Sequence, residues 1–276
     1  MLFNKKWLTA KYGPDFPGVK AEIERLTNQR HLQRIAKEAE SYELQMIAVR
    51  KIEDQRVLIK IAMTDAETAV RICALNRIVS KDARLEIAVS IIEDVKVSDY
   101  YRVDAIKAII NEYPQAQEHL RSIIARADTK EILRSAELID DKDVAQAAFR
   151  RVVLESKYTS EKMQALEHIR DDAYLIDIIN REDDGEVSLK AADRISEETK
   201  RQSAFRDIAN NTRIRLKERY EAAVMISDEQ ERRNALKDIL LTAEARVEQK
   251  SGSNIWHDKE MISIVEKCRT ALNGLG

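Results

Sequence analysis

The side chains most often used for catalysis and metal binding are few in this chain and form no recognised pattern. None of the four histidines has zinc-site spacing; they are His31, His119, His168 and His257. Cys73 and Cys268 lie far apart, so no CxxC motif is present. No nucleophile elbow, phosphate-binding loop or dinucleotide fingerprint occurs. The sequence favours a non-catalytic protein, and we expect no cofactor and no metal.

A second chemistry to consider is phosphate binding. Residues 199–220 contain seven basic side chains and two acidic ones. A local excess of positive charge attracts nucleic acid, although the default interpretation of such a run is a solvated helix face. The residues that would contact phosphate are Lys200, Arg201, Arg206, Arg213, Arg215 and Lys217. Nucleic-acid binding is therefore an alternative function that the sequence leaves open.

The composition limits the fold and the compartment. The chain has 276 residues, 35% charged and 5% aromatic, with 6 glycines and 3 prolines, too few for the turns of a sandwich or barrel. With a formal charge of −2, the protein as a whole is not attracted electrostatically to nucleic acid or to anionic membranes. The unpaired cysteines and the lack of a signal-peptide core or a long apolar stretch predict a cytoplasmic protein without membrane insertion.

A repeat of 26 to 31 residues organises the sequence. An alanine recurs in register seven times, at Ala48, Ala74, Ala105, Ala136, Ala165, Ala191 and Ala222. Four residues after each of these column alanines stands an isoleucine, except that Asp140 replaces it in the fourth repeat. Acidic pairs follow most repeats, and we expect them to cap the next helix: Glu53-Asp54, Asp140-Asp141, Asp171-Asp172, Glu197-Glu198 and Asp228-Glu229.

The apolar spacing predicts that each repeat is a helical hairpin. At about 100° per residue, the positions around each column alanine fall on one apolar stripe. Neither helix can bury its face alone, so stacked hairpins with caps at both ends are required. We expect an all-α solenoid over residues 1–228 with an N-terminal cap, and capping helices over 229–276. Val224 and Met225 are expected to be covered by this second layer.

The repeat core resembles that of HEAT-like repeat proteins. The resemblance rests on the VRxxA-like segment Val70-Arg71-Ile72-Cys73-Ala74, on the matching segment 101–105, and on the short unit length over about residues 18–228. It implies a right-handed α-α superhelix. It implies little about function, because the family includes scaffolds, lyases, hydroxylases and DNA glycosylases.

Basic residues recur three positions before the column alanine, at Arg71, Arg102, Lys162 and Arg219. Such a ladder could bind phosphates. That position lies near the middle of the apolar stripe, however, where a cation needs a partner. The resemblance to HEAT-like proteins implies an Asp–Arg ladder joining adjacent repeats, and Asp65 and Asp99 lie just upstream. We therefore interpret these cations as structural.

The surface opposite the stripe is the candidate binding site. The side chains two residues after the column alanines are basic in early repeats and acidic in later ones. The next position along the chain adds two cations in the early repeats. We expect this outward row to bind an acidic segment of another protein through Arg50, Lys51, Arg77, Tyr100, Lys107, Glu167 and Asp193. The predicted function is a macromolecular recognition scaffold; the alternative is a nucleic-acid-binding or DNA-repair protein resembling HEAT-like DNA glycosylases.

Overall fold

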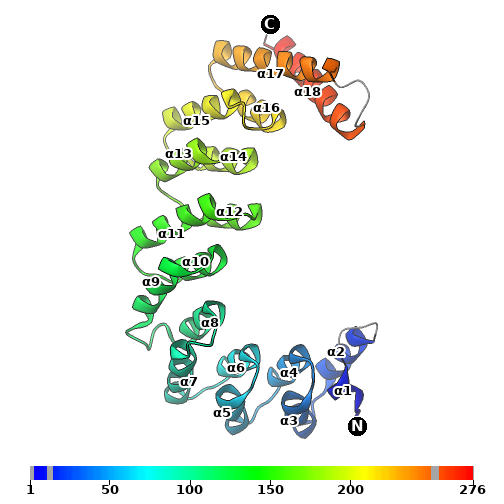
Figure 1. Cartoon of the computed structure of the whole chain (residues 1–276), viewed down its shortest axis with the longest axis vertical. Coiled ribbons are helices and arrows are strands. Elements are labelled where there is room, and N and C mark those ends of the chain that lie inside the picture. The colour runs from blue at the N-terminus through cyan, green and yellow to red at the C-terminus, as the bar shows by residue number, and fades with distance from the viewer. Residues whose placement is uncertain (1–2, 11–14, 250–254, 276) are drawn as a thin grey trace. The chain divides into compact units, whose positions relative to one another are not determined.

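The computed structural model describes residues 3–10, 15–249 and 255–275, and in these residues it contains 18 helices and no strand (Figure 1). The predicted all-α class is confirmed. None of the described helices combines the length and apolar character needed to cross a membrane. The chain divides into two compact units, Met1–Asp140 and Asp141–Gly276.

The first unit contains a short N-terminal pair of helices followed by four hairpins. Its helices are α1 (Lys6–Thr9), α2 (Phe16–Arg25), α3 (Gln29–Glu38), α4 (Tyr42–Val49), α5 (Gln55–Thr64), α6 (Thr68–Leu75), α7 (Lys81–Glu93), α8 (Asp99–Ile109), α9 (Ala116–Arg126) and α10 (Thr129–Ala136). Within the unit the second helices α4, α6, α8 and α10 pack on one another in chain order. Trp7 of α1 is buried, and its Nε1 donates to Glu22 of α2 at 2.7 Å.

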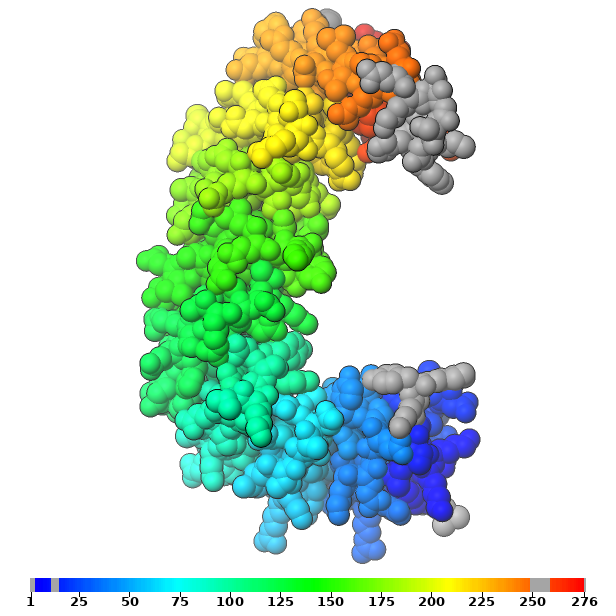
Figure 2. Space-filling view, viewed as in Figure 1, coloured from blue at the N-terminus to red at the C-terminus, as the bar shows by residue number. Residues whose placement is uncertain are grey.

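The second unit contains three hairpins and a terminal pair. Its helices are α11 (Lys142–Glu155), α12 (Thr159–Leu166), α13 (Asp172–Arg181), α14 (Gly185–Arg194), α15 (Glu198–Asn210), α16 (Leu216–Val224), α17 (Glu229–Gln249) and α18 (Ile255–Asn273). The helices α17 and α18 pack on each other and both contact α16, so they belong to the same compact unit as the hairpins before them. In Figure 2 the helix pairs of each unit follow one another as bands of colour. Neighbouring hairpins in contact within each unit are the arrangement of a helical solenoid.

The two sequence columns form the core. All seven column alanines lie in second helices and are at most 3% exposed, which lets neighbouring helices approach closely. The six column isoleucines are buried as well. The exception, Asp140, is exposed, and Ile139 beside it is buried instead. The repeat pattern therefore predicted which face of each second helix is buried.

The acidic residues between hairpins cap helices where the side chain is aspartate. Asp54 accepts from the amide of Arg56 at 2.9 Å, and Asp171 accepts from Ala173 at 2.7 Å. Asp141 and Asp228 cap α11 and α17 in the same way. Glu197 precedes α15 but makes no side-chain cap, because its longer side chain does not suit the capping geometry. The capping prediction is confirmed for these four aspartates and wrong for Glu197.

The basic residues three before the column alanine are structural, but their partners differ from those expected. Arg71 donates to the carbonyl of Ala62 at 3.0 Å, and no ion pair joins it to Asp65 in the described part of the chain. Arg102 bonds Asp99 at 3.2 Å, as expected, and also the carbonyl of Asp94 at 2.7 Å. Each of these arginines thus closes its own hairpin. A partly buried guanidinium can donate to a carbonyl at a helix end, because that carbonyl has no donor within its own helix.

The same position joins adjacent elements in the second unit. Lys162 of α12 pairs with Glu182, which follows α13, at 2.6 Å. Arg219 of α16 is 2% exposed, and it bonds the carbonyl of Ala209 and the carboxylate of Asp238 in α17, both at 2.8 Å. This bond helps to fix α17 on the last hairpin.

A column of glutamines, which was not predicted from the sequence, links the two helices in five of the seven hairpins. In α11, Gln146 donates from Nε2 to the carbonyl of His168 and accepts on Oε1 from the amide of Arg170, both at 2.8 Å. The same two bonds, from the first helix to the turn after the second helix, are made by Gln29, Gln55, Gln117 and Gln202. The signal was present in the sequence, because four of these five glutamines stand 19 residues before a column alanine.

The terminal pair does not cover Val224 and Met225. Their side chains are 38% and 50% exposed, whereas Ala223 and Ile226 beside them are buried. The prediction that a second layer packs over Val224 and Met225 is wrong. The pair α17–α18 instead contacts α16 where the buried Arg219 bonds Asp238 of α17.

Candidate functional site

The candidate site of the first unit lies on its second helices. Arg50 follows α4, Asn76 follows α6 and Lys107 lies in α8, and all three side chains are exposed, as the outward row requires. Beside this row lies a hollow of about 580 Å³, which we call the tyrosine hollow. It is lined by Tyr42, Met46, Arg50, Ala69, Ile72, Cys73, Asn76, Arg77, Tyr100, Tyr101 and Asp104.

Two tyrosines of this hollow, Tyr100 and Tyr101, are held in place by their neighbours. The rings of Tyr100 and Tyr101 meet edge to face with centroids 5.2 Å apart. The guanidinium of Arg134 lies 4.1 Å from the centre of the Tyr100 ring and donates to the Tyr100 carbonyl at 2.9 Å. Arg134 also forms an ion pair with Asp104, so the aspartate of the hollow is neutralised from α10. A fixed aromatic surface loses little conformational entropy when it binds a partner.

Positive charge remains at one side of the tyrosine hollow. The Arg50 guanidinium lies beside the Cys73 thiol, and in the described chain no acidic side chain pairs with Arg50. Desolvation raises the pKa of Cys73, while the charges of Arg50 and Arg77 oppose that rise. The thiol is therefore protonated at neutral pH and is a poor nucleophile. Arg50 and Arg77 give the hollow an excess of positive charge.

Two residues of the predicted row also join neighbouring repeats. Arg77 donates to the carbonyl of Ile52 at 3.2 Å, and Lys51 donates to the carbonyls of Ile23 and Glu24. Arg194 makes the equivalent bond to Ile169 in the second unit. These cations satisfy carbonyls at the end of the preceding second helix. Substitution of Lys51 or Arg77 would therefore affect folding as well as any binding.

The acidic residues of the predicted row belong to the second unit. Glu167 pairs with Lys190 at 2.9 Å and with Arg194 at 3.3 Å, and the hydrogen bond from Lys190 is the main cause of its lowered pKa. Asp193 is exposed in α14. The structure thus brings Arg50, Arg77 and Tyr100 into one hollow, with Lys107 on the same row of helices. That the acidic pair continues this row stays a prediction.

The basic run of residues 199–220 carries little free charge. All seven of its cations form ion pairs. For example, Lys200 pairs with Glu197 at 2.6 Å and Arg213 pairs with Asp183 at 3.0 Å. The remaining candidates for phosphate contact pair in the same way: Arg201 with Glu198, Arg206 with Glu231, Arg215 with Glu218 and Lys217 with Glu221. A phosphate backbone would have to compete with these carboxylates, because charges within a Debye length act together.

The histidines contact aromatic rings. His168 stacks on Phe149 with centroids 4.6 Å apart, and His119 stacks on Tyr113 at 5.7 Å. His31 lies 5.8 Å from the Trp7 ring. The side chain of His257 lies outside the described residues. The described part of the chain contains no group of three or more His, Cys, Asp and Glu side chains arranged to hold a metal ion.

Two of the three tyrosines in the hollow were not predicted from the sequence. Tyr42 begins α4, and Tyr101 follows Tyr100 in the first turn of α8. All three stand four to six residues before a column alanine, in repeats that flank α6. Comparing the first turn of each second helix across neighbouring repeats would have found them, because stacked second helices place corresponding turns close together.

Comparisons with known proteins leave the family of this chain open. No protein-family model matches the chain, and no curated protein matches it. One similar solved structure is described as "Computational Design of Self-Assembling Cyclic Protein Homooligomers". It is 15% identical, with 95% of this chain and 92% of that chain covered, and the TM-score is 0.13. A similarity this low says nothing about fold or function.

Proposed function

We propose that this protein is a HEAT-like right-handed α-α superhelix that acts as a non-catalytic recognition scaffold in the cytoplasm and binds an acidic segment of another protein. The observation that carries the proposal is the tyrosine hollow. It combines three tyrosine side chains with Arg50 and Arg77 on the outward face of the second helices. Tyrosine and arginine are the side chains most enriched where binding energy is concentrated at interfaces.

Charge favours an acidic partner. Asp104 is paired with Arg134, so the guanidinium groups of Arg50 and Arg77 are the uncompensated charges of the hollow. Lys107 extends the basic surface along the same helices. Such a surface speeds association with acidic segments and makes the association sensitive to salt. The Glu167 and Asp193 pair would fix the direction of the bound segment.

A test is selection of peptides from a random 12-residue display library on the full-length protein. We expect enrichment of peptides that combine Asp or Glu with an aromatic or large apolar residue. The double variant Arg50→Glu, Lys107→Glu should weaken binding of the selected peptides by at least about tenfold and flatten the salt dependence. This variant leaves Arg77 and its bond to Ile52 in place.

The matched control is Lys200→Glu, Arg201→Glu, which reverses two surface cations of the second unit. It should leave peptide binding unchanged. Enrichment of peptides without acidic residues, or equal binding by the Arg50 and Lys107 variant, would show that the tyrosine hollow is not the site. Loss of binding only in the control, together with salt-sensitive binding of duplex DNA, would favour the nucleic-acid alternative.

A further inference from the structure

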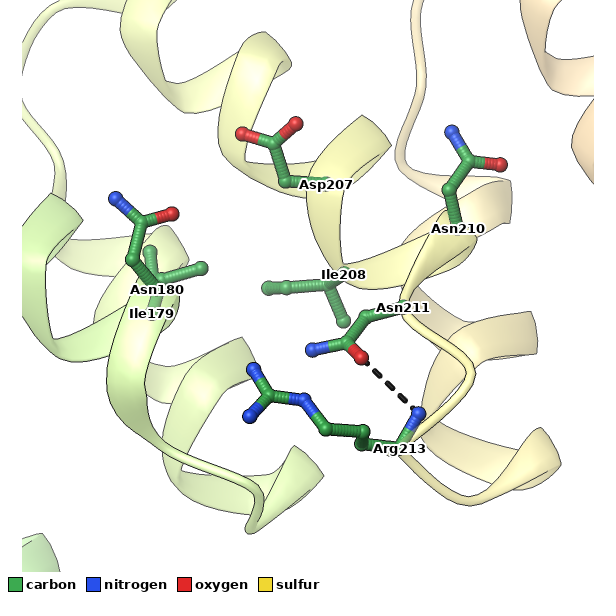
Figure 3. A pocket seen from close by; sticks show the side chains of 7 residues that line it. All are labelled: Ile179, Asn180, Asp207, Ile208, Asn210, Asn211 and Arg213. Atoms are coloured by element: carbon green, nitrogen blue, oxygen red, sulfur yellow. Dashed lines mark hydrogen bonds between the residues drawn. The ribbon is translucent and has the colours of Figure 1, made fainter.

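Two adjoining hollows lie between the first helices α13 and α15 of the second unit, and together we call them the amide groove. Their volumes are about 270 Å³ and about 130 Å³, and Ile179, Asn180 and Asp207 line both. Figure 3 shows the larger hollow, with Asp207 at one end and Arg213 at the other. Asn180 comes from α13, whereas Asn210 and Asn211 come from the end of α15. The buried side chains of Ile179 and Ile208 form an apolar floor.

The polar groups of this groove are open to a ligand. In the described residues, the side chains of Asn180, Asn210 and Asp207 have no hydrogen bond or ion pair with any other group. Asn211 uses only its Oδ1, which accepts from the backbone amide of Arg213 at 3.0 Å, so its NH₂ group stays available. Figure 3 shows this amide and the Arg213 guanidinium reaching toward α13. Three carboxamides at one groove therefore keep unused donors or acceptors.

Carboxamides are matched to peptide bonds. Each offers an N–H donor and a carbonyl acceptor side by side, the same pair that a backbone peptide group presents. A bound strand whose backbone groups pair with the protein gains affinity from its main chain and specificity from a few side chains. The apolar floor of Ile179 and Ile208 would exclude water from those bonds.

One charge in the groove lacks a counterion. Lys200 and Arg213 also line it, but they pair with Glu197 and Asp183 respectively. Arg206, the cation whose charge acts on Asp207, pairs with Glu231 at 3.0 Å. Asp207 is exposed and can be reached, yet partial desolvation of its carboxyl raises its pKa. A cationic ligand group would stabilise the ionised form of this carboxylate.

We propose that the amide groove binds an extended peptide segment that carries a basic side chain. Asn180, Asn210 and Asn211 bond the peptide backbone, and Asp207 pairs with the lysine or arginine of the segment. This site lies in the second unit and takes a basic segment, whereas the tyrosine hollow lies in the first unit and takes an acidic one. The two proposals are therefore independent and can fail separately.

The test uses the full-length chain labelled with ¹⁵N-asparagine and two probe peptides, Ac-Ala-Ala-Lys-Ala-Ala-NH₂ and the same peptide with glutamate in place of lysine. Titration with the lysine peptide should shift the side-chain amide signals of Asn180, Asn210 and Asn211. Its dissociation constant should be at least about tenfold lower than that of the glutamate peptide. Asp207→Asn should reduce this preference to about twofold or less, and Asn180→Ala should weaken both peptides.

The matched control is Glu186→Gln, which removes an exposed carboxylate from α14 of the same unit. It should retain the preference for lysine, since a general attraction between the basic peptide and an acidic surface would be reduced by either substitution. The proposal is overturned if the asparagine amides do not move at millimolar peptide, or if the glutamate peptide binds as well as the lysine peptide. Equal loss in Glu186→Gln and Asp207→Asn would also overturn it.

Discussion

Replacing Gln146 by alanine tests whether the glutamine column stabilises the hairpins. The substitution removes two hydrogen bonds of 2.8 Å, one to the His168 carbonyl and one from the Arg170 amide. The first is partly buried and the second is exposed. A net contribution of about 0.5 to 1.5 kcal/mol for each bond gives a loss of about 1 to 3 kcal/mol, reduced by a few tenths because alanine favours helix slightly more.

The assay is urea unfolding followed by circular dichroism, combined with amide hydrogen exchange. We expect a lower midpoint for Gln146→Ala and faster exchange at the amide of Arg170, because that N–H loses its acceptor. Gln146→Glu keeps an oxygen to accept from Arg170 but loses the donor, so its loss of stability should be about half as large.

Gln33→Ala is the matched control, because Gln33 lies within helix α3 and its side chain makes no hydrogen bond in the described part of the chain. Its stability should equal or slightly exceed that of the parent protein. Gln146 does not stabilise its hairpin if Gln146→Ala unfolds like Gln33→Ala, or if exchange at the Arg170 amide is unchanged.

Three further predictions concern packing, the structural arginines and a buried thiol. Gly185→Ala should lower stability by about 1 to 3 kcal/mol in thermal unfolding, because the added Cβ would lie 2.6 Å from Cγ2 of Ile214; a variant as stable as the parent would contradict this close approach. Arg102→Ala should cost about 1 to 3 kcal/mol by leaving the Asp94 carbonyl without its donor, while binding of selected peptides by the folded variant stays constant. Burial raises the pKa of Cys268 to about 11, above the ordinary value of 9.0. Since the folded state holds this proton more tightly than the unfolded state, the thiol stabilises the fold below pH 9 and loses that contribution as the pH rises through 11. Urea midpoints of parent and Cys268→Ala should therefore converge over that range, and parallel pH profiles would refute it.

The repeat columns made the helices predictable. An alanine and an isoleucine in fixed register identify the buried stripe of each second helix. This packing pattern is the same whatever the function of the repeat. Hydrogen-bond partners were harder to predict, because a side chain can have several possible partners. Arg71 takes the Ala62 carbonyl instead of Asp65, because a helix end offers unsatisfied carbonyls that no count of charged residues reveals.

Polar residues with a purely structural role were harder to recognise. A glutamine in a helix is commonplace, so the column that includes Gln55 and Gln146 drew no attention although its offset is nearly constant. Each glutamine of this column can make its two bonds only if the start of the first helix lies close to the turn that follows the second helix. That distance follows only from the crossing of the two helices.

The candidate sites show why a charge pattern in sequence is a weak guide to binding. The run of residues 199–220 has the larger excess of basic residues, yet every cation in it has a carboxylate partner. Four partners lie three or four residues away in the chain, and three come from neighbouring elements. Arg50 is one charge in an unremarkable stretch, and it keeps its charge available beside three tyrosines. Binding depends on the charge that remains after intramolecular pairing, and on the rigid surface that presents it. In this chain the remaining charge is set by ion pairs three or four residues apart and by ion pairs about one repeat apart. A sequence search for binding sites in a solenoid should therefore subtract the pairs at both separations before counting charge.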